Sequence, residues 1–88
     1  VVSAVGNNVD FVSRYFTPQA TILEDPVTGS AHCSLIPYWS DRLNKNKLKA
    51  LQLSIRGGSL ICLNKLDRVI IGGKAITYLK GKIEIDEI

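Results

Sequence analysis

The chain has 88 residues, of which 45% are hydrophobic and 22% charged, and its formal net charge is +3 at pH 7. This length allows one small domain with a modest core. The composition is that of a globular protein, and no apolar stretch approaches the roughly 20 residues that a bilayer requires. We therefore expect a single folded unit with no membrane partner.

The positive charge does not by itself predict a nucleic-acid partner. Nucleic-acid binding needs a basic face in which exposed aromatic side chains lie among the cations. The aromatic residues lie within apolar patterns instead, and they are Phe11, Tyr15, Phe16, Tyr38, Trp39 and Tyr78. We therefore expect no nucleic-acid binding.

Two cysteines, Cys33 and Cys62, limit the chemistry further. Their spacing is not that of a metal site, and two are too few for a disulfide framework. We expect both to be reduced core residues of a cytoplasmic protein.

The first predicted element is a hairpin. Residues 9–16 alternate and are rich in aromatic and β-branched side chains, and residues 6–8 (Gly-Asn-Asn) form a turn that brings residues 1–5 alongside. Pro18 breaks the strand, and the chain continues as a loop toward Asp25 and Pro26.

A single helix is predicted from Gly29 to about Leu43. Its apolar positions recur at three and four residues, as on one helical face, and they are Leu35, Ile36, Trp39 and Leu43. Residues 44–47 close the helix. A half-buried strand follows, in which Leu51, Leu53 and Ile55 alternate with polar residues and form the expected inner face.

This strand and two more, over residues 59–63 and 68–71, form a predicted three-stranded meander. Short strands over residues 75–79 and 83–85 complete the expected antiparallel run. One helix among many strands indicates the α+β class. We expect a curved, mainly antiparallel sheet, or partial barrel, wrapped around one central helix.

Residues 24–32, with the sequence EDPVTGSAH, form the one stretch with the character of a site. A helix start leaves N–H groups unpaired and carries partial positive charge, so it stabilises an anion such as a substrate carboxylate. Gly29 and Ser30 would supply those N–H groups, and Asp25 would face the bound molecule as a proton donor or acceptor.

Helix capping is the alternative explanation for the same residues. Asp25 followed by proline is a good N-cap and first-turn pair, and Thr28 could cap a helix that begins one turn later. Ser30 and His32, two positions apart on a helix, point in different directions, so a Ser-His dyad is not expected. We expect His32 to be packed in the core or to support residues that contact the ligand.

Four runs of sequence carry a resemblance to a known family: DFVSRYFTP, EDPVTGSAH, PYW and QLSIRGG, at residues 10–18, 24–32, 37–39 and 52–58. Their order and spacing resemble the C-terminal half of the PhzF (phenazine biosynthesis F-like) isomerases. These proteins are similar in fold to diaminopimelate epimerase. The resemblance implies two pseudo-symmetric lobes, each a curved sheet around a helix, with the active site between them.

The resemblance implies a cofactor-free proton shift on a small carboxylate-bearing metabolite, with no metal. Asp25 matches the polar aspartate of the family's site, and Gly29 with Ser30 matches the turn that contacts substrate. We predict Asp25 and Ser30 as catalytic residues and Thr28, Gly29 and Ser30 as substrate-binding residues. Arg56 is either a further ligand for a carboxylate or a residue that braces its loop.

The family's acid/base glutamate belongs to an N-terminal lobe, in a stretch with a Gly-Asn-Pro motif that this chain lacks. The resemblance therefore predicts that the whole chain, residues 1–88, is a C-terminal lobe that would not turn over alone. We expect the N-terminal lobe or a second subunit as partner, with a homodimer favoured. The alternative is a non-catalytic binding or self-assembly module.

Overall fold

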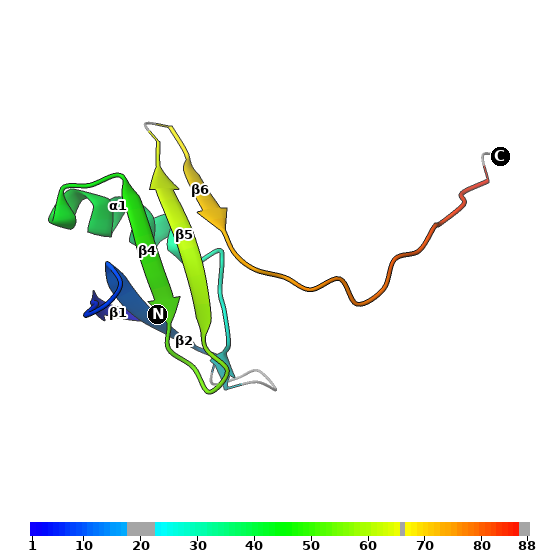
Figure 1. Ribbon diagram of the computed structural model, residues 1–88, viewed down its shortest axis with the longest axis horizontal. Helices are drawn as coiled ribbons and strands as arrows, with labels where there is room; N and C mark the ends of the chain where they lie inside the picture. Colours follow the sequence, from blue (N-terminus) through cyan, green and yellow to red (C-terminus); the bar gives the residue numbers. More distant parts are fainter. Residues whose placement is uncertain (18–22, 66, 87–88) are drawn as a thin grey trace.

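The computed structural model describes residues 1–17, 23–65 and 67–86. Within them, one helix packs on a six-stranded, mostly antiparallel sheet (Figure 1), which confirms the expected α+β class. The strand order is β1-β2-β4-β5-β6, and β3 pairs with β2 off this path. After β6, residues 73–86 leave the body as an extended segment without regular secondary structure.

The predicted opening hairpin is confirmed. β1 (Val2–Val5) pairs antiparallel with β2 (Phe11–Phe16), with Val5 opposite Phe11. The N–H of Gly6 donates to the Asp10 carbonyl at 3.1 Å and closes the turn. β2 turns Phe11 and Ser13 inward, because alternate residues of a strand face the same side.

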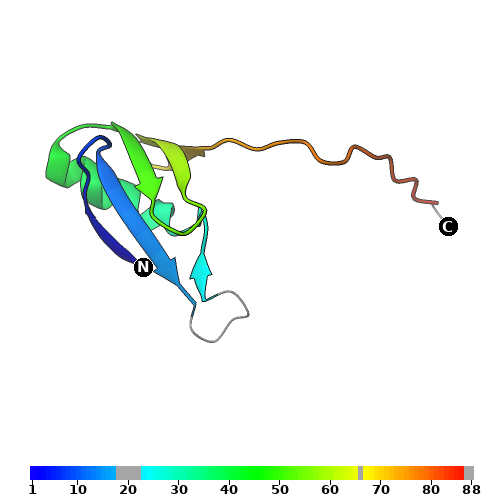
Figure 2. The same ribbon diagram turned by 60° about the horizontal axis from the view of Figure 1, so that its bottom comes forward.

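The end of β2 has a second partner that the sequence did not predict. β3 (Glu24–Asp25) pairs antiparallel with it, with Asp25 opposite Tyr15, where a loop was expected (Figure 2). The predicted break at Pro18 lies outside the described residues. β2 also pairs in parallel with β4 (Lys47–Gln52), which requires a crossover between the two strands. That crossover contains the helix.

Helix α1 (His32–Leu43) begins three residues later than predicted. It buries Leu35, Ile36 and Trp39 against the sheet, so the predicted apolar face is confirmed. Asn44 ends the helix with φ 55°, a left-handed conformation that asparagine tolerates. Among the described residues, no helix has the length and apolar character needed to cross a bilayer.

The inner face of β4 is the opposite of the predicted one. Leu48, Ala50 and Gln52 are buried, whereas Leu53 and Ile55 lie beyond the strand and are exposed. A shift of one residue exchanges the two faces of a strand. The sheet buries Leu48 and Ala50 against α1, and the amide of Gln52 is hydrogen bonded inside, so its burial carries no unpaired polar group.

The three-stranded meander is confirmed, but the two strands predicted after it are wrong. β5 (Gly58–Asn64) pairs antiparallel with β4 and with β6 (Val69–Gly72). Residues 75–79 and 83–85 form no strand. An alternating segment becomes a strand only when a neighbouring strand pairs with its N–H and C=O groups. None of the described strands pairs with residues 75–79 or 83–85.

The core lies between α1 and the inner face of the sheet. Figure 2 shows the ribbon of the helix and the sheet from a second direction. Its buried hydrophobic members are Phe11, Leu35, Ile36, Trp39, Leu48, Ala50, Leu60 and Cys62. Cys62 is thus a core residue as predicted. Cys33 is exposed, so its predicted burial is wrong, because it lies on the outer face of α1.

Candidate functional site

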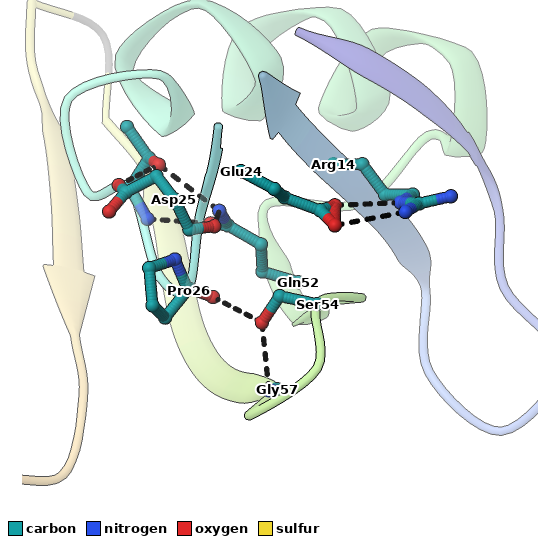
Figure 3. A network of polar contacts seen from close by, with 8 residues as sticks. Arg14, Glu24, Asp25, Pro26, Gln52, Ser54 and Gly57 are labelled. Atoms are coloured by element: carbon teal, nitrogen blue, oxygen red, sulfur yellow. Dashed lines mark hydrogen bonds and ion pairs between the residues drawn. The ribbon is translucent and has the colours of Figure 1, made fainter. Parts of the chain in front are cut away.

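The predicted site residues lie where β3 leads into α1. Pairing with β2 fixes the backbone of Asp25, and residues 26–31 then connect it to the first turn of the helix at His32. The loop that follows β4 lies beside this connection (Figure 3). Residues far apart in the sequence therefore meet at the start of α1.

A hydrogen-bonded group of Asp25, Thr28 and Gln52 forms the centre of the site, and Figure 3 shows Asp25 beside Gln52. The Thr28 hydroxyl donates to the Asp25 carboxylate through Oδ2. Gln52 Oε1 accepts from the Thr28 N–H at 2.6 Å, and Gln52 Nε2 donates to the Asp25 carbonyl at 2.9 Å. Nε2 also lies 3.1 Å from Thr28 Oγ1. These contacts hold the half-buried Asp25 by both its carboxylate and its backbone carbonyl.

The loop after β4 joins the same structure through Ser54. Its hydroxyl donates to the Pro26 carbonyl at 3.0 Å and accepts from the Gly57 N–H at 2.8 Å. Gly57 has φ +75°, a conformation that glycine adopts without a steric penalty. Ser54 therefore joins the two loops through its bond to Pro26, and the bond from Gly57 holds the Ser54 hydroxyl within its own loop.

The open N–H donors lie just before α1, because those of its first turn bond the carbonyls of residues 29–31. The N-cap residue Ala31 makes no side-chain cap hydrogen bond, so neither capping arrangement proposed for Asp25 and Thr28 occurs. Among the described residues, no hydrogen bond occupies the N–H groups of Gly29, Ser30 or Ala31. Gly29 and Ser30 are exposed, and a Cβ at Gly29 would meet no atom within 4 Å. The helix start can therefore receive an anion.

His32 is packed, as predicted. It is fully buried, its ring centroid lies 5.8 Å from that of Phe11, and Nδ1 lies 2.7 Å from the Thr28 carbonyl oxygen. A carbonyl can only accept, so Nδ1 carries the proton and donates. Nε2 is buried without a partner among the described residues. His32 thus anchors the backbone of Thr28 from the helix side.

Glu24, next to the predicted aspartate, is bound to another side chain. Arg14 donates Nε and Nη2 to its two carboxylate oxygens at 2.8 and 2.9 Å, and the guanidinium lies 4.8 Å over the Phe16 ring. The hydrogen bond from Arg14 lowers the pKa of Glu24 below its ordinary value. Glu24 is therefore held as a charged partner of Arg14 beside the site.

Arg56 and Gly29 line one hollow of about 740 Å³ between the loop after β4 and the root of the extended segment. Arg56 and Lys74 both line this hollow and are exposed. Among the described residues, no cluster of three or more His, Cys, Asp or Glu side chains could hold a metal ion. The polar groups that the site does offer suit an anionic ligand.

Gln52 and Ser54 are the site residues that the sequence analysis missed. The alternating pattern places both on the outer face of a strand, whereas Gln52 is 1% exposed and Ser54 bonds Pro26. The available signal was the run at residues 52–58, which carries part of the family resemblance but had a role considered only for Arg56.

A family model described as phenazine biosynthesis-like protein (PhzC-PhzF) matches residues 2–81. The chain belongs to this PhzF family. It is 54% identical over 85 residues to an uncharacterized isomerase of Pseudomonas aeruginosa, covering 97% of this chain and 33% of that protein. It is also 52% identical over 75 residues to phenazine biosynthesis-like domain-containing protein 1 of Mus musculus, covering 84% of this chain and 26% of the relative.

Solved structures of PhzF proteins share the fold. A PhzF family protein from Enterococcus faecalis gives a TM-score of 0.81 at 55% identity, and one from Clostridium difficile gives 0.80 at 54% identity. Each match covers 94% of this chain and 32% of the other. The chain thus spans about a third of its PhzF relatives, which is less than the half that was predicted.

Proposed function

We propose that this chain is the C-terminal lobe of a two-lobed, cofactor-independent PhzF isomerase. The complete protein would transfer a proton between two positions of a small carboxylate-bearing metabolite. Two Pseudomonas aeruginosa relatives, 54% and 49% identical to this chain, are described as uncharacterized isomerases, which supports the reaction class. A chain that matches about a third of each relative is consistent with one lobe.

The observation that carries this proposal is the pairing of a fixed carboxylate with an open helix start. Asp25 is held by Thr28 and Gln52, and the free N–H groups of Gly29 and Ser30 lie in the same loop. Preorganised N–H donors stabilise negative charge that develops during a reaction. The substrate carboxylate, or an enolate-like charge formed from it, would be bound there, with the Ser30 hydroxyl as a further donor.

Proton transfer requires a second acid/base group in this scheme. A carboxylate of the N-terminal lobe would remove a proton from a substrate carbon, and the same proton equivalent would return at another carbon, so no electrons leave the substrate. Asp25 would hydrogen bond to the substrate and assist the transfer. Thr28 would contribute mainly by holding Asp25, in addition to the predicted contact with substrate.

Deuterium incorporation tests this function across a range of candidate substrates. The complete protein that carries this chain is incubated in D2O with a set of small amino, hydroxy and unsaturated carboxylic acids, and solvent deuterium at carbon is measured by NMR. We expect exchange into at least one acid, and a loss of about 100-fold in Asp25→Asn and Ser30→Ala. Asp41→Asn, on the exposed face of α1, is the matched control. Unchanged exchange in both site variants would contradict the proposal.

Self-assembly is the second candidate function, and the exposed extended segment favours it. Ile76 and Tyr78 are 96% and 98% exposed, and Ile83 and Ile85 are almost as open. Apolar surface of this kind marks an interaction site. The partner would be a second copy of the chain or the other lobe of the same protein, and sedimentation as a clean monomer at micromolar concentration would contradict a homodimer.

A further inference from the structure

We propose that Gln52 is a positioning residue that fixes the orientation of the Asp25 carboxylate through the hydroxyl of Thr28. The functional meaning of this inference rests on the proposed role of Asp25, but the geometry stands by itself. Gln52 is 1% exposed and lies at the end of β4, 24 positions beyond Thr28. Gln52 reaches the loop that contains Thr28 only because the fold places the end of β4 next to that loop.

The orientation of the Gln52 amide is determined by its partners. Oε1 faces the Thr28 N–H at 2.6 Å, and Nε2 faces the Asp25 carbonyl oxygen at 2.9 Å. A flipped amide would place oxygen against oxygen and N–H against N–H. Only one arrangement satisfies both contacts, so Nε2 is the atom beside Thr28 Oγ1.

That arrangement gives the Thr28 hydroxyl a direction. Because Nε2 of Gln52 donates to Oγ1, the hydroxyl proton must point elsewhere, and the Asp25 carboxylate is the acceptor in reach. The hydrogen bonds therefore run from amide to hydroxyl to carboxylate. Chains of this kind strengthen one another in a partly buried setting.

Backbone pairing alone does not supply this constraint. The strand pair of Asp25 with Tyr15 fixes the main chain, but the carboxylate still rotates about its own side-chain bonds. Pro26, the next residue, has no N–H with which to hold it. The contact from Thr28, itself oriented by Gln52, therefore selects the side-chain rotamer of Asp25.

The test measures the side-chain rotamer of Asp25 by the two Hα–Hβ NMR couplings, which do not depend on any substrate. We expect one rotamer in the wild-type chain. In Gln52→Met and Thr28→Val, both couplings should move toward the intermediate values of an averaged side chain, whereas Thr28→Ser, which keeps the hydroxyl, should retain the wild-type values.

Asn64→Leu is the matched control. The Asn64 amide also donates to a hydroxyl, that of Ser40 at 3.1 Å, but neither residue belongs to the site. A purely structural role for Gln52 predicts that Gln52→Met behaves like Asn64→Leu, with lower stability and an unchanged Asp25 rotamer, and that result would overturn the proposal. If Gln52→Met fails to fold, the pair Thr28→Val and Thr28→Ser still tests the chain of hydrogen bonds, since only Thr28→Ser keeps the hydroxyl between Gln52 and Asp25; an unchanged Asp25 rotamer in Thr28→Val would overturn the proposal.

Deuterium exchange in the complete protein separates this inference from the proposed function. We expect Gln52→Met to lower the exchange rate about 10-fold through misorientation of Asp25, and Asn64→Leu to leave it within a factor of two. If Asp25→Asn exchanges normally while the couplings still respond to Gln52→Met, the function fails and the positioning role survives. If the couplings do not respond, the positioning role fails whatever the exchange rate.

Discussion

Gly58 and Val27 lie against each other with no room for another side chain between them. A Cβ at Gly58 would overlap Cγ2 of Val27 and would lie 3.2 Å from its Cβ. Gly58 is also the residue opposite Gln52 in the pairing of β4 with β5. The contact therefore sets how closely the loop before α1 approaches β5, at the position paired with Gln52.

Gly58→Ala should lower the free energy of unfolding by about 1–3 kcal/mol, because added volume in a packed site forces its neighbours to move. The β-branched side chain of Val27 is stiff and cannot rotate away at low cost. Urea unfolding measures the change. Gly73→Ala is the control, since a Cβ there meets nothing within 4 Å. Equal stabilities of the two variants would contradict the steric argument.

The ion pair of Arg14 and Glu24 predicts a pH dependence of stability. The hydrogen bond from Arg14 lowers the folded-state pKa of Glu24 below its ordinary value of 4.5. The unfolded chain then binds the proton more tightly, so the pair stabilises the fold above that ordinary value. This contribution should be lost as the pH falls through the folded-state pKa, as urea unfolding between about pH 6 and pH 3 would measure.

Removal of the arginine tests the cause of that shift. Arg14→Gln should raise the pKa of Glu24 toward 4.5, measured from the side-chain carboxyl carbon by NMR titration. Arg68→Gln, at an exposed pair with Asp67 elsewhere in the chain, should leave the pKa of Glu24 unchanged. A Glu24 titration that is the same in wild type and Arg14→Gln would show that Arg14 is not the cause.

The two cysteines should differ in reactivity. Cys62 is fully buried, and this burial, with a smaller effect of the Asp10 charge, raises its pKa to about 11. Alkylation requires an accessible thiolate. In the folded chain at about pH 8, iodoacetamide should modify Cys33 only, and denaturant should expose the second thiol. Mass spectrometry reads the number of adducts, and rapid native labelling of Cys62 in Cys33→Ser would contradict its burial.

The elements that were predicted correctly are those with local signals. The turn at residues 6–8 lies between two alternating runs, and the helix has its apolar residues at three- and four-residue spacing. Each signal is complete within a short stretch of chain. The main departure at the helix was its first turn, where residues 29–31 precede α1 without a side-chain cap.

The inner face of β4 depended on distant residues. Leu51, Leu53 and Ile55 are more apolar as a set than Leu48, Ala50 and Gln52, so composition favoured the wrong face. A buried glutamine is tolerated here only because Asp25 and Thr28 satisfy its amide, and no local pattern shows that contact. This contact of Gln52 with Asp25 and Thr28 is also the part of the candidate site that the sequence did not predict.

The extended segment after β6 should be dispensable for folding of the body. Residues 73–86 are exposed throughout, so truncation after Lys74 should change the free energy of unfolding by no more than about 0.5 kcal/mol. Chemical denaturation followed by Trp39 fluorescence measures this. Loss of folding in the truncated chain would show that the segment belongs to the folding unit.

The same truncation should weaken self-association, because an alternating apolar segment with unpaired backbone groups adds readily to an open sheet edge. Ile76→Lys with Tyr78→Lys keeps the chain length and is the matched control. Both should sediment as smaller species than the wild-type chain at the same concentration. If the truncated, charged and wild-type chains all sediment alike, the segment is not the contact surface, and the self-assembly alternative loses the observation that favours it.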